Sequence, residues 1–481
     1  MTYFQTSSAM GKVTAVACGF LIGGCAVGPD YVEPDLSPPT GWTQAAQEGE
    51  TDLTEWWQQF GDEQLTDLIQ RSTDGNLDVR VAFERITEAR ELLRVTSVRR
   101  FPSVGVSESA TRSDLSERTS GVNTSPASVY DIGLSVGWEL DVFGRVRRSI
   151  EAASADFETL VEDYRGVMTS VHAAVASAYI DVRLAQRRLS IARANVVIQQ
   201  GGLKFATDRR DAGQVSGLDV AQAEANIATT EATIPTLEVD LDRFIYRLAV
   251  LLGSPIAPLR VELQVEKPIP SGPAAIASGL PANLLRHRPD LRAAERSLAA
   301  ETARVGVAAA DLYPSFDLAA SLGVQALEVN DLFDGGARRW SVGVSGLNTL
   351  FNFGGLRANI GAQEARVRQA LATYEQTLLL SIEEVETAMT SLQREKTRAA
   401  ALQRAVTANE RSVELSEQLY RSGQVDFQNL QDTQRSLLDV EDQLATSEAA
   451  ITQNMVSLFL ALGGSWDPNE DVLSPREDTD Q

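Results

Sequence analysis

Two periods of apolar residues alternate along this chain of 481 residues, and each predicts a different kind of element. Over two long stretches apolar side chains recur every seven residues, which is typical of helices that supercoil around their neighbours. The stretches run from about Gly144 to Arg210 and from about Gly355 to Tyr420, and each predicts a helix about 100 Å long. A second seven-residue stripe follows each of them. The pattern therefore predicts two long helical hairpins. The apolar positions of the first helix of each are Val161, Met168, Val175, Val182, Leu189, Val196 and Leu203, then Leu371, Leu378, Val385, Leu392, Ala399, Val406 and Val413.

Ahead of each hairpin the apolar period changes from seven to two, which predicts β-strands with one apolar and one polar face. The strongest strand signal runs from Tyr130 to Leu140, two others run from Phe316 to Val324 and from Trp340 to Val344, and a weaker one surrounds Val104 and Val106. About ten residues suffice for a tilted strand to cross a bilayer. The alternative is a half-buried antiparallel sheet with one face in water.

Four strands are too few to close a membrane barrel, since the smallest single-chain barrels have about eight, and an open sheet edge cannot lie in lipid. If the strands cross a membrane, the chain must therefore oligomerise. Three copies, giving twelve strands, are the simplest small solution.

The two hairpins are copies of one unit. Three pairs of motifs recur at the same offset of 210 residues, and a constant offset over more than a hundred residues indicates a duplication almost without insertions. The pairs are Phe143-Gly144 with Phe353-Gly354, Gly213-Gln214-Val215 with Gly423-Gln424-Val425, and Leu252-Gly253 with Leu462-Gly463.

The N-terminus reads as a targeting segment. A short apolar run from Val13 to Ile22 is too short to span a membrane as a helix. It ends in Leu21-Ile22-Gly23-Gly24-Cys25, which resembles a bacterial lipobox. We therefore expect residues 1–24 to be a lipoprotein signal peptide and Cys25 to be the lipidated residue, although Met10 is an alternative start and an uncleaved apolar N-terminus the alternative reading. Ala26 after the cysteine fits sorting to the outer membrane.

Charge and composition exclude several function classes. The chain has 43 Lys and Arg against 66 Asp and Glu, a net charge of -23, which disfavours nucleic-acid binding. Two cysteines and two histidines leave little room for a metal site, so we expect neither metal nor cofactor. No phosphate loop of Walker type occurs, and neither His172 nor His287 is placed by its sequence neighbours beside a nucleophile. We therefore expect no enzymatic activity.

Several ordered motifs now carry a family resemblance that extends from the lipobox to about Gly464. The chain resembles an outer-membrane factor of the TolC/OprM type, and within it the lipoprotein branch often labelled NodT, which serves RND efflux systems. The motifs are Cys25 to Tyr31, Trp56-Trp57-Gln58-Gln59-Phe60-Gly61-Asp62, Ala212-Gly213-Gln214-Val215-Ser216, Arg288-Pro289-Asp290-Leu291-Arg292 and Tyr313-Pro314-Ser315.

The resemblance implies an α+β membrane protein: a homotrimer with a transmembrane barrel of twelve strands, continuous with a periplasmic α-barrel of twelve helices. The hairpins of the β-barrel are expected at 101–143 and 313–354. An equatorial belt would use the lipidated linker 25–75, the Pro-rich connector 253–287 and the acidic tail 463–481. The helices of the α-barrel are expected at 76–100, 144–252, 288–312 and 355–462.

As to function, the resemblance implies an exit duct in the outer membrane of a Gram-negative bacterium, lipid-anchored and extending into the periplasm. It would pass drugs or other small toxic molecules received from a periplasmic adaptor protein and an inner-membrane RND-type transporter. One alternative is the duct of a type I protein secretion system. Another is a structural coiled-coil lipoprotein that tethers the layers of the envelope.

The turns of the two hairpins are the candidate adaptor contacts, because the family docks through these tips. The residues are Gly213, Gln214, Val215 and Ser216 in the first turn and Gly423, Gln424, Val425 and Asp426 in the second. A good helix reversal without a partner is the alternative reading of the same motif.

Matching motif positions also implies a periplasmic gate. Asp219 and Asp432 are its acidic candidates and Tyr420 its aromatic residue. Val425 and Asn429 stand where some relatives have an Arg and a second Asp, so the family's salt-bridged latch is not expected here. Candidates to replace it, or to form a merely solvated tip, are Arg209, Arg210 and Asp211. Acidic rings at the tip would make the pore prefer cations.

Overall fold

The structure, a computed structural model, describes residues 26–36, 38–43, 53–114, 126–274, 276, 281–283, 287–464 and 466. Cys25, the predicted lipidation site, lies outside these residues, as does nearly all of the acidic tail. The chain divides into two compact units. The first comprises Met1–Asp35, Arg85–Leu160 and Ala293–Glu375, and the second comprises Leu36–Glu84, Val161–Arg292 and Gln376–Gln481.

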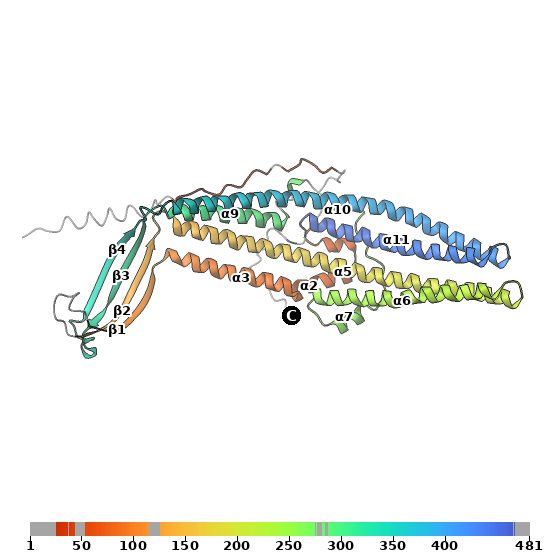
Figure 1. Cartoon of the computed structure of the whole chain (residues 1–481), viewed down its shortest axis with the longest axis horizontal. Coiled ribbons are helices and arrows are strands. Elements are labelled where there is room, and N and C mark those ends of the chain that lie inside the picture. The colour runs from red at the N-terminus through yellow and green to blue at the C-terminus, as the bar shows by residue number, and fades with distance from the viewer. Residues whose placement is uncertain are drawn as a thin grey trace, which may run out of the picture. The chain divides into compact units, whose positions relative to one another are not determined.

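The first unit contains one antiparallel sheet with the strand order β1-β2-β3-β4 (Figure 1). Its centre is the pair β2–β3, in which Tyr130 lies opposite Ala326 and Leu140 opposite Phe316, so strands from the two repeats are joined directly. Within the described residues β1 and β4 form the two open edges of the sheet. The strands are β1 (Ser103–Ser113), β2 (Ala127–Leu140), β3 (Ser315–Ala326) and β4 (Arg338–Leu347).

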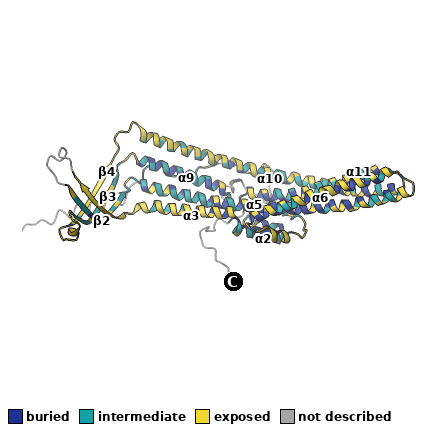
Figure 2. Cartoon of the chain, turned by 60° about the horizontal axis from the view of Figure 1, so that its bottom comes forward, coloured by how far each residue is buried: buried dark blue, intermediate teal, exposed yellow. Residues whose placement is uncertain are grey.

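The strand register sorts apolar and polar side chains onto opposite faces of this sheet, because successive residues of a strand point to opposite sides. One row across all four strands is apolar and exposed, from 47% for Leu134 to 77% for Trp340. Figure 2 shows exposed residues on these strands. The apolar row consists of Val106, Leu134, Leu322 and Trp340, and its polar neighbour consists of Gly105, Ser135, Ser321 and Ser341. A single chain therefore leaves the apolar face of its sheet uncovered.

Two long helical hairpins make up most of the helical part of the structure (Figure 1). The first consists of α5 (Arg145–Asp211) and α6 (Gly217–Leu251), and the second of α10 (Gly355–Arg421) and α11 (Phe427–Ala461). Each long helix has 67 residues, which corresponds to about 100 Å. The seven-residue stripe is buried along much of both, at Val175, Val182, Leu189 and Val196 in α5 and at Leu378, Val385, Leu392, Val406 and Val413 in α10.

The repeated Leu-Gly pair ends both return helices in the same way. Gly253 and Gly463 have positive φ angles of 58° and 86°, and the residue after each donates its N–H to the carbonyl five residues earlier. This is the Schellman motif, which satisfies carbonyls that the end of a helix leaves free. A side chain would not fit at either glycine. A Cβ at Gly253 would lie 2.0 Å from the Gly75 carbonyl oxygen, and one at Gly463 would lie 2.5 Å from that of His287.

The second unit packs its short helices against the middle of the hairpins. Trp56 is only 1% exposed and stacks on Phe459 of α11 at 5.3 Å. Arg183 of α5 is fully buried and donates to the Val265 carbonyl at 2.9 Å and to the Gln64 side chain. The predicted linker and connector therefore both touch the hairpin core. The short helices are η1 (Trp56–Phe60), α2 (Glu63–Gly75), α7 (Ile256–Glu262) and η3 (Pro281–Asn283).

Two further α-helices and two short 3-10 helices complete the described part of the fold. The helix α3 (Leu77–Ser97) continues into η2 (Val98–Arg100) just before β1, α9 (Pro289–Ala310) precedes β3, and η4 (Val329–Asp331) lies between β3 and β4. Across the described residues, the helices lack the combined length and apolar character of a membrane-spanning helix.

In the first unit, the segment from Ala26 to Tyr31 (the N-terminal strap) is held against α5 and α9. Val27 donates its N–H to the Phe143 carbonyl at 3.1 Å. Arg148, 4% exposed, donates to the Val27 carbonyl at 3.2 Å and to the Asp30 carboxylate at 2.6 Å. A Cβ at Gly28 would lie 2.5 Å from the Gly306 Cα, so glycine is required where the strap crosses α9.

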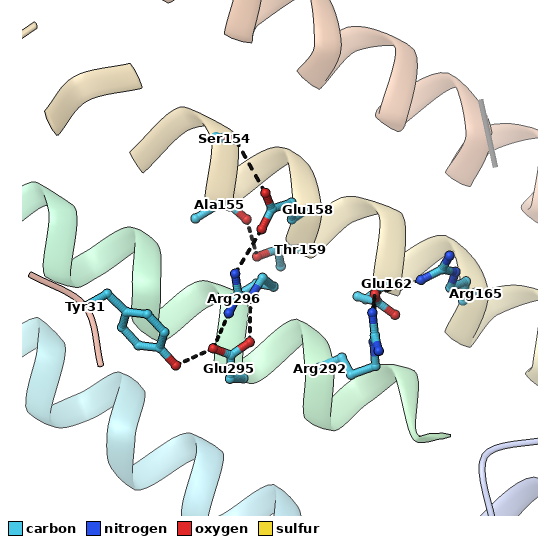
Figure 3. Close-up of polar contacts among 10 residues, drawn as sticks. All are labelled: Tyr31, Ser154, Ala155, Glu158, Thr159, Glu162, Arg165, Arg292, Glu295 and Arg296. Carbon is cyan, nitrogen blue, oxygen red and sulfur yellow. Dashed lines mark hydrogen bonds and ion pairs between the residues drawn. The ribbon is translucent and has the colours of Figure 1, made fainter. Parts of the chain in front are cut away.

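Figure 3 shows the polar contacts that continue from the strap into the first unit. The Tyr31 hydroxyl donates to Glu295, and Arg296 bridges Glu295 and Glu158, the latter at 3.1 Å. Burial and the neighbouring Glu295 raise the pKa of the Tyr31 phenol. The strap is therefore fixed by hydrogen bonds and charge as well as by close packing.

The same figure shows a separate cluster in the second unit. There Glu162 is 4% exposed and accepts from Arg165 and Arg292, each at 2.8 Å (Figure 3). Both arginines also lie over the Trp466 ring, at 4.4 and 5.3 Å from its centroid. The Glu162 carboxylate and the Trp466 indole thus connect α5, the start of α9 and the end of the described chain.

Candidate functional site: the two hairpin tips

Both hairpin turns have the same backbone geometry. Gly213 and Gly423 have φ angles of 69° and 78°, and each donates its N–H to the carbonyl three residues earlier. Gln214 and Gln424 each donate at 2.9 Å to the carbonyl five residues earlier. These are the two bonds of a Schellman motif, which explains why glycine stands at these two positions. The repeated Gly-Gln-Val motif therefore ends the long helix of both hairpins in the same way.

The starts of the two return helices differ. Ser216 caps α6, its hydroxyl accepting from the Leu218 N–H at 3.1 Å. Asp426 occupies the same position before α11, but its side chain makes no capping bond. A carboxylate that is exposed and not used as a cap remains available for other contacts. The second turn therefore presents a carboxylate at the position where the first turn has the neutral Ser216.

The candidate adaptor residues are mostly exposed. In both turns the glycine and the glutamine are exposed, as are Ser216 and Asp426, whereas Val215 and Val425 are half-buried. Val425 packs against the apolar cluster between the hairpins. Each turn is therefore a polar, exposed surface anchored by a half-buried valine.

An apolar cluster joins the two tips beneath the turns. Its members come from all four helices of the hairpins and are 0–8% exposed. Tyr420 is 1% exposed, and its ring lies 5.4 Å from that of Phe427 in an edge-to-face arrangement. The buried members are Ala206, Val220, Ala223, Tyr420, Phe427 and Leu430.

Three of the predicted gate residues meet at this cluster. The Tyr420 hydroxyl donates to the Asp219 carboxylate at 3.2 Å. Arg209 donates to the Tyr420 carbonyl at 2.6 Å, and its guanidinium lies 4.8 Å from the centre of the Tyr420 ring. Burial and the nearby Asp219 carboxylate raise the pKa of Tyr420 to about 12. Asp219, Tyr420 and Arg209 therefore form one connected group that joins the two hairpins.

The other two predicted gate residues lie outside this group. Arg210 pairs with its sequence neighbour Asp211 at 2.7 Å and stays exposed. Asp432 is exposed on α11, and within the described residues it is not joined to Tyr420 or Asp219. The two residues predicted from the same turn, Arg209 and Arg210, thus have different environments.

Sequence reasoning missed the second contact between the hairpins. Arg421, at the end of α10, lies 4.0 Å from the centre of the Phe205 ring on α5. Neither residue belongs to a repeated motif, and the contact joins helices from different repeats. A sequence offers no periodic signal for such a pair. The one signal that the sequence offers is a basic residue in the last turn of α10, where a positive charge is favourable at a helix C-terminus.

His172 contacts a hydroxyl from a distant part of the sequence, which its sequence neighbours could not indicate. Its Nε2 lies 2.8 Å from the hydroxyl oxygen of Thr73, 99 residues earlier in the chain. The imidazole is 3% exposed and lies edge-on to Trp57 at 5.0 Å. An enclosed pair of this kind joins α2 to α5. No group of three metal-ligating side chains is found in the described part of the chain.

Comparison with protein families identifies a match along both halves of the chain. Residues 68–254 and 280–464 match the family described as outer membrane efflux protein. The two matched stretches end 210 residues apart, which is the offset of the internal repeat. The family unit thus occurs twice in this chain.

Similar proteins match over nearly their whole length. The chain is 31% identical over 468 residues to Nodulation protein T of Rhizobium leguminosarum bv. viciae, covering 97% of this chain and 96% of that protein. It is 30% identical to the toluene efflux pump outer membrane protein TtgF of Pseudomonas putida, covering 94% of this chain and 96% of that protein.

The similar solved structures are outer-membrane channels as well. The outer-membrane channel OprN matches at 36% identity with a TM-score of 0.85, covering 92% of this chain and 99% of that one. The CmeC outer membrane channel of Campylobacter jejuni has a TM-score of 0.87 at 20% identity, covering 93% of this chain and 96% of that one, and supports the fold alone.

Proposed function

This chain belongs to the family of outer membrane efflux proteins, and from that membership we propose that it is the outer-membrane exit duct of a tripartite efflux pump. It conducts substrates passively, as a channel does, and its family is not a class of enzymes.

The observation that carries the proposal is the incomplete sheet. β1 and β4 are the edges of a four-stranded sheet whose apolar face is exposed, with Val106 at 68% and Trp340 at 77%. Unpaired backbone groups at an edge are tolerated in lipid only when another strand covers them. Identical copies supply that strand if β4 of one chain pairs with β1 of the next.

We propose three copies. Three sheets of four strands give a barrel of twelve strands, a number within the range of bacterial outer-membrane barrels. The rows of Gly and Ser then face the lumen and the apolar rows face lipid. The same symmetry brings together twelve long and return helices, counting four from each chain, as a periplasmic α-barrel.

We propose that a lipid on Cys25 assists this anchoring after residues 1–24 are removed. One acyl chain gives weak membrane binding, so several chains or a barrel are needed for stable attachment. The linker 25–75, the connector 253–287 and the tail 463–481 are proposed to form the equatorial belt around the helices.

We propose that the tips receive cargo from a periplasmic adaptor and an RND-type inner-membrane transporter. The contact surface would be the two Gly-Gln-Val turns with Ser216 and Asp426. Support comes from the exposure of these residues and from the pump-component names of similar proteins, among them a toluene efflux pump protein. Small toxic molecules are the substrate class that this similarity favours.

The test combines a transport assay with a bilayer recording. A strain lacking the gene should accumulate a fluorescent efflux substrate, and the wild-type chain should restore its export. The purified chain should conduct ions in planar bilayers. Export that is normal without the gene, together with a purified chain that never conducts, would reject the duct and favour a structural lipoprotein.

The adaptor surface has its own test. Gln424→Arg in the exposed second turn should weaken export several-fold without lowering the amount of protein in the membrane. Gln428→Arg is a matched control, since it lies exposed on the first turn of α11 but outside the Gly-Gln-Val motif. Equal export by both variants and the wild type would contradict the contact role of the turn.

A further inference from the structure

An ion pair crosses the polar face of the sheet at the end that lies away from the helices. Arg339, the second residue of β4, pairs with Asp131 of β2, and its Nη2 and Nε each lie 2.5 Å from a carboxylate oxygen. Because β3 lies between these two strands, the arginine side chain spans a whole strand to reach its partner. Asp131 is only 8% exposed, and a carboxylate so far removed from water is costly without a partner.

Two glycines leave room for this side chain. Arg339 lies directly opposite Gly323 of β3, and Gly323 lies directly opposite Gly133 of β2. A Cβ at Gly133 would lie 3.6 Å from the Arg339 Nη2, and a Cβ at Gly323 would lie 2.4 Å from the Ile132 carbonyl oxygen. Glycine inside a strand often marks a place where another group approaches closely. The polar face is therefore bare where the arginine crosses it.

Two serines of the polar row adjoin the ion pair. The Arg339 Nη1 donates to the Ser321 hydroxyl at 3.4 Å, and the hydroxyl oxygens of Ser321 and Ser341 lie 2.8 Å apart. The Arg339 side chain remains 35% exposed. The pair thus lies at the surface of the polar face, where its charges can act on ions in the adjacent water.

The internal repeat does not reproduce this ion pair. At the offset of 210 residues, Asp131 corresponds to Ser341, and Arg339 corresponds to Val129. The pair therefore uses positions at which the two copies differ. Three copies of the chain give three such pairs, all at one level of the proposed barrel.

We propose that the three Arg339–Asp131 pairs (the exit ring) balance the charge at the outer end of the lumen, so that the exit does not select cargo by charge. The inference rests on the proposed duct function, which turns the polar face of the sheet toward the lumen. Without Arg339 the ring would carry three negative charges, and without Asp131 it would carry three positive ones. Like charges in a confined passage focus the potential and attract ions of the opposite sign, and pairing removes both fields.

The test is the reversal potential of the purified full chain in planar bilayers under a KCl gradient. Arg339→Ala should raise the ratio of K⁺ to Cl⁻ permeability about two-fold, because it leaves the carboxylates unpaired. Asp131→Asn should lower the ratio by about the same factor, because it leaves the guanidinium groups unpaired. The double variant loses both charges and should return to the ratio of the wild type.

The neighbouring arginine provides the matched control. Arg338 is exposed, and because successive residues of a strand point to opposite faces, it lies on the face opposite to Arg339. Arg338→Ala removes the same charge and should leave the permeability ratio unchanged. Arg339→Lys keeps the charge and loses only the two-pronged contact, so its ratio should stay near that of the wild type.

The outcomes separate failure of the exit ring from failure of the duct. If the pair only braces the sheet, both single variants will unfold at lower temperature and conduct with the ratio of the wild type, which would overturn the exit ring and leave the duct intact. A shift in Arg338→Ala that is absent in Arg339→Ala would place the polar face outside the lumen and overturn it as well. Absence of conductance from every protein, the wild type included, would reject the duct and the exit ring with it.

Discussion

Tyr420 is the residue on which burial, charge and packing at the tips converge. Its ring is 1% exposed and its hydroxyl donates to Asp219 at 3.2 Å. Removal from water and the adjacent carboxylate both disfavour the phenolate, which raises the pKa of Tyr420 to about 12. The residue is therefore a neutral hydrogen-bond donor at any physiological pH.

This predicts how the tips respond to alkali. Because the folded-state pKa lies above the ordinary value of 10, the neutral phenol stabilises the tip fully below pH 10, and this contribution is lost as the pH rises toward 12. In an absorbance titration of tyrosinate, Tyr420→Phe should lack one step near pH 12. The variant should lose about 1 kcal/mol of stability at neutral pH, the usual value of one hydrogen bond. A missing step near pH 10 would contradict the burial of this ring.

The same substitution at two glycines of α5 and its turn should have opposite effects. Gly213→Ala puts a side chain at a φ of 69° and should destabilise the hairpin by about 1–2 kcal/mol. Gly201→Ala lies inside α5, where an added Cβ meets no atom within 4 Å, and should stabilise it by about 0.5–1 kcal/mol. Thermal unfolding of the two variants tests both signs. A gain from Gly213→Ala would show that the turn is not the Schellman motif described here.

At the scale of elements, the sequence predicted the helices and strands whose apolar residues recur at a regular period. The seven-residue stripes predicted the two hairpins, and the structure has α5 ending at Asp211 where the pattern ended near Arg210. Alternation predicted four strands. It did not predict the pairing of β2 with β3. A hydrophobic pattern shows which side chains of a strand face the same side of the sheet, but not which strand lies next to it.

Contacts between distant, non-periodic residues stayed invisible for a related reason. The motif positions led to Tyr420 and Asp219, which the structure joins. They did not lead to Arg421 over Phe205, nor to Arg148 gripping the strap, since a single arginine in a long helix is usually an exposed one. Such contacts depend on how segments far apart in the sequence pack against each other.

The strap gives a prediction at this scale. Gly28→Ala should detach Ala26 to Tyr31, because its φ is 90° and a Cβ would lie 2.5 Å from the Gly306 Cα. Limited proteolysis of the purified protein should then cut the N-terminal segment several-fold faster. Gly41→Ala is the control, since nothing lies within 4 Å of a Cβ there. Equal cutting of both variants would mean that the strap does not depend on this close approach.

At the scale of the whole molecule, negative charge is abundant. The net charge is -23, and in a trimer the exposed Asp432 and the partly buried Asp219 would each occur three times near the tip. Carboxylates around one axis concentrate negative potential and attract cations.

We therefore predict a cation-preferring pore. Asp432→Asn should lower the cation-to-anion permeability ratio by about two-fold, measured as the reversal potential in a salt gradient. Glu63→Gln removes the same charge from an exposed position on α2 and should leave the ratio unchanged. Anion preference of the wild-type pore would refute the assignment of the acidic rings.

The central proposal concerns the sheet. Within the described residues one chain has a sheet with two open edges and an uncovered apolar face, and we propose that copies of the same chain complete it. The most direct measurement is the mass of the purified protein in detergent micelles, by native mass spectrometry. We expect one species containing three chains that persists at low protein concentration. A stable, well-folded single chain would contradict the account.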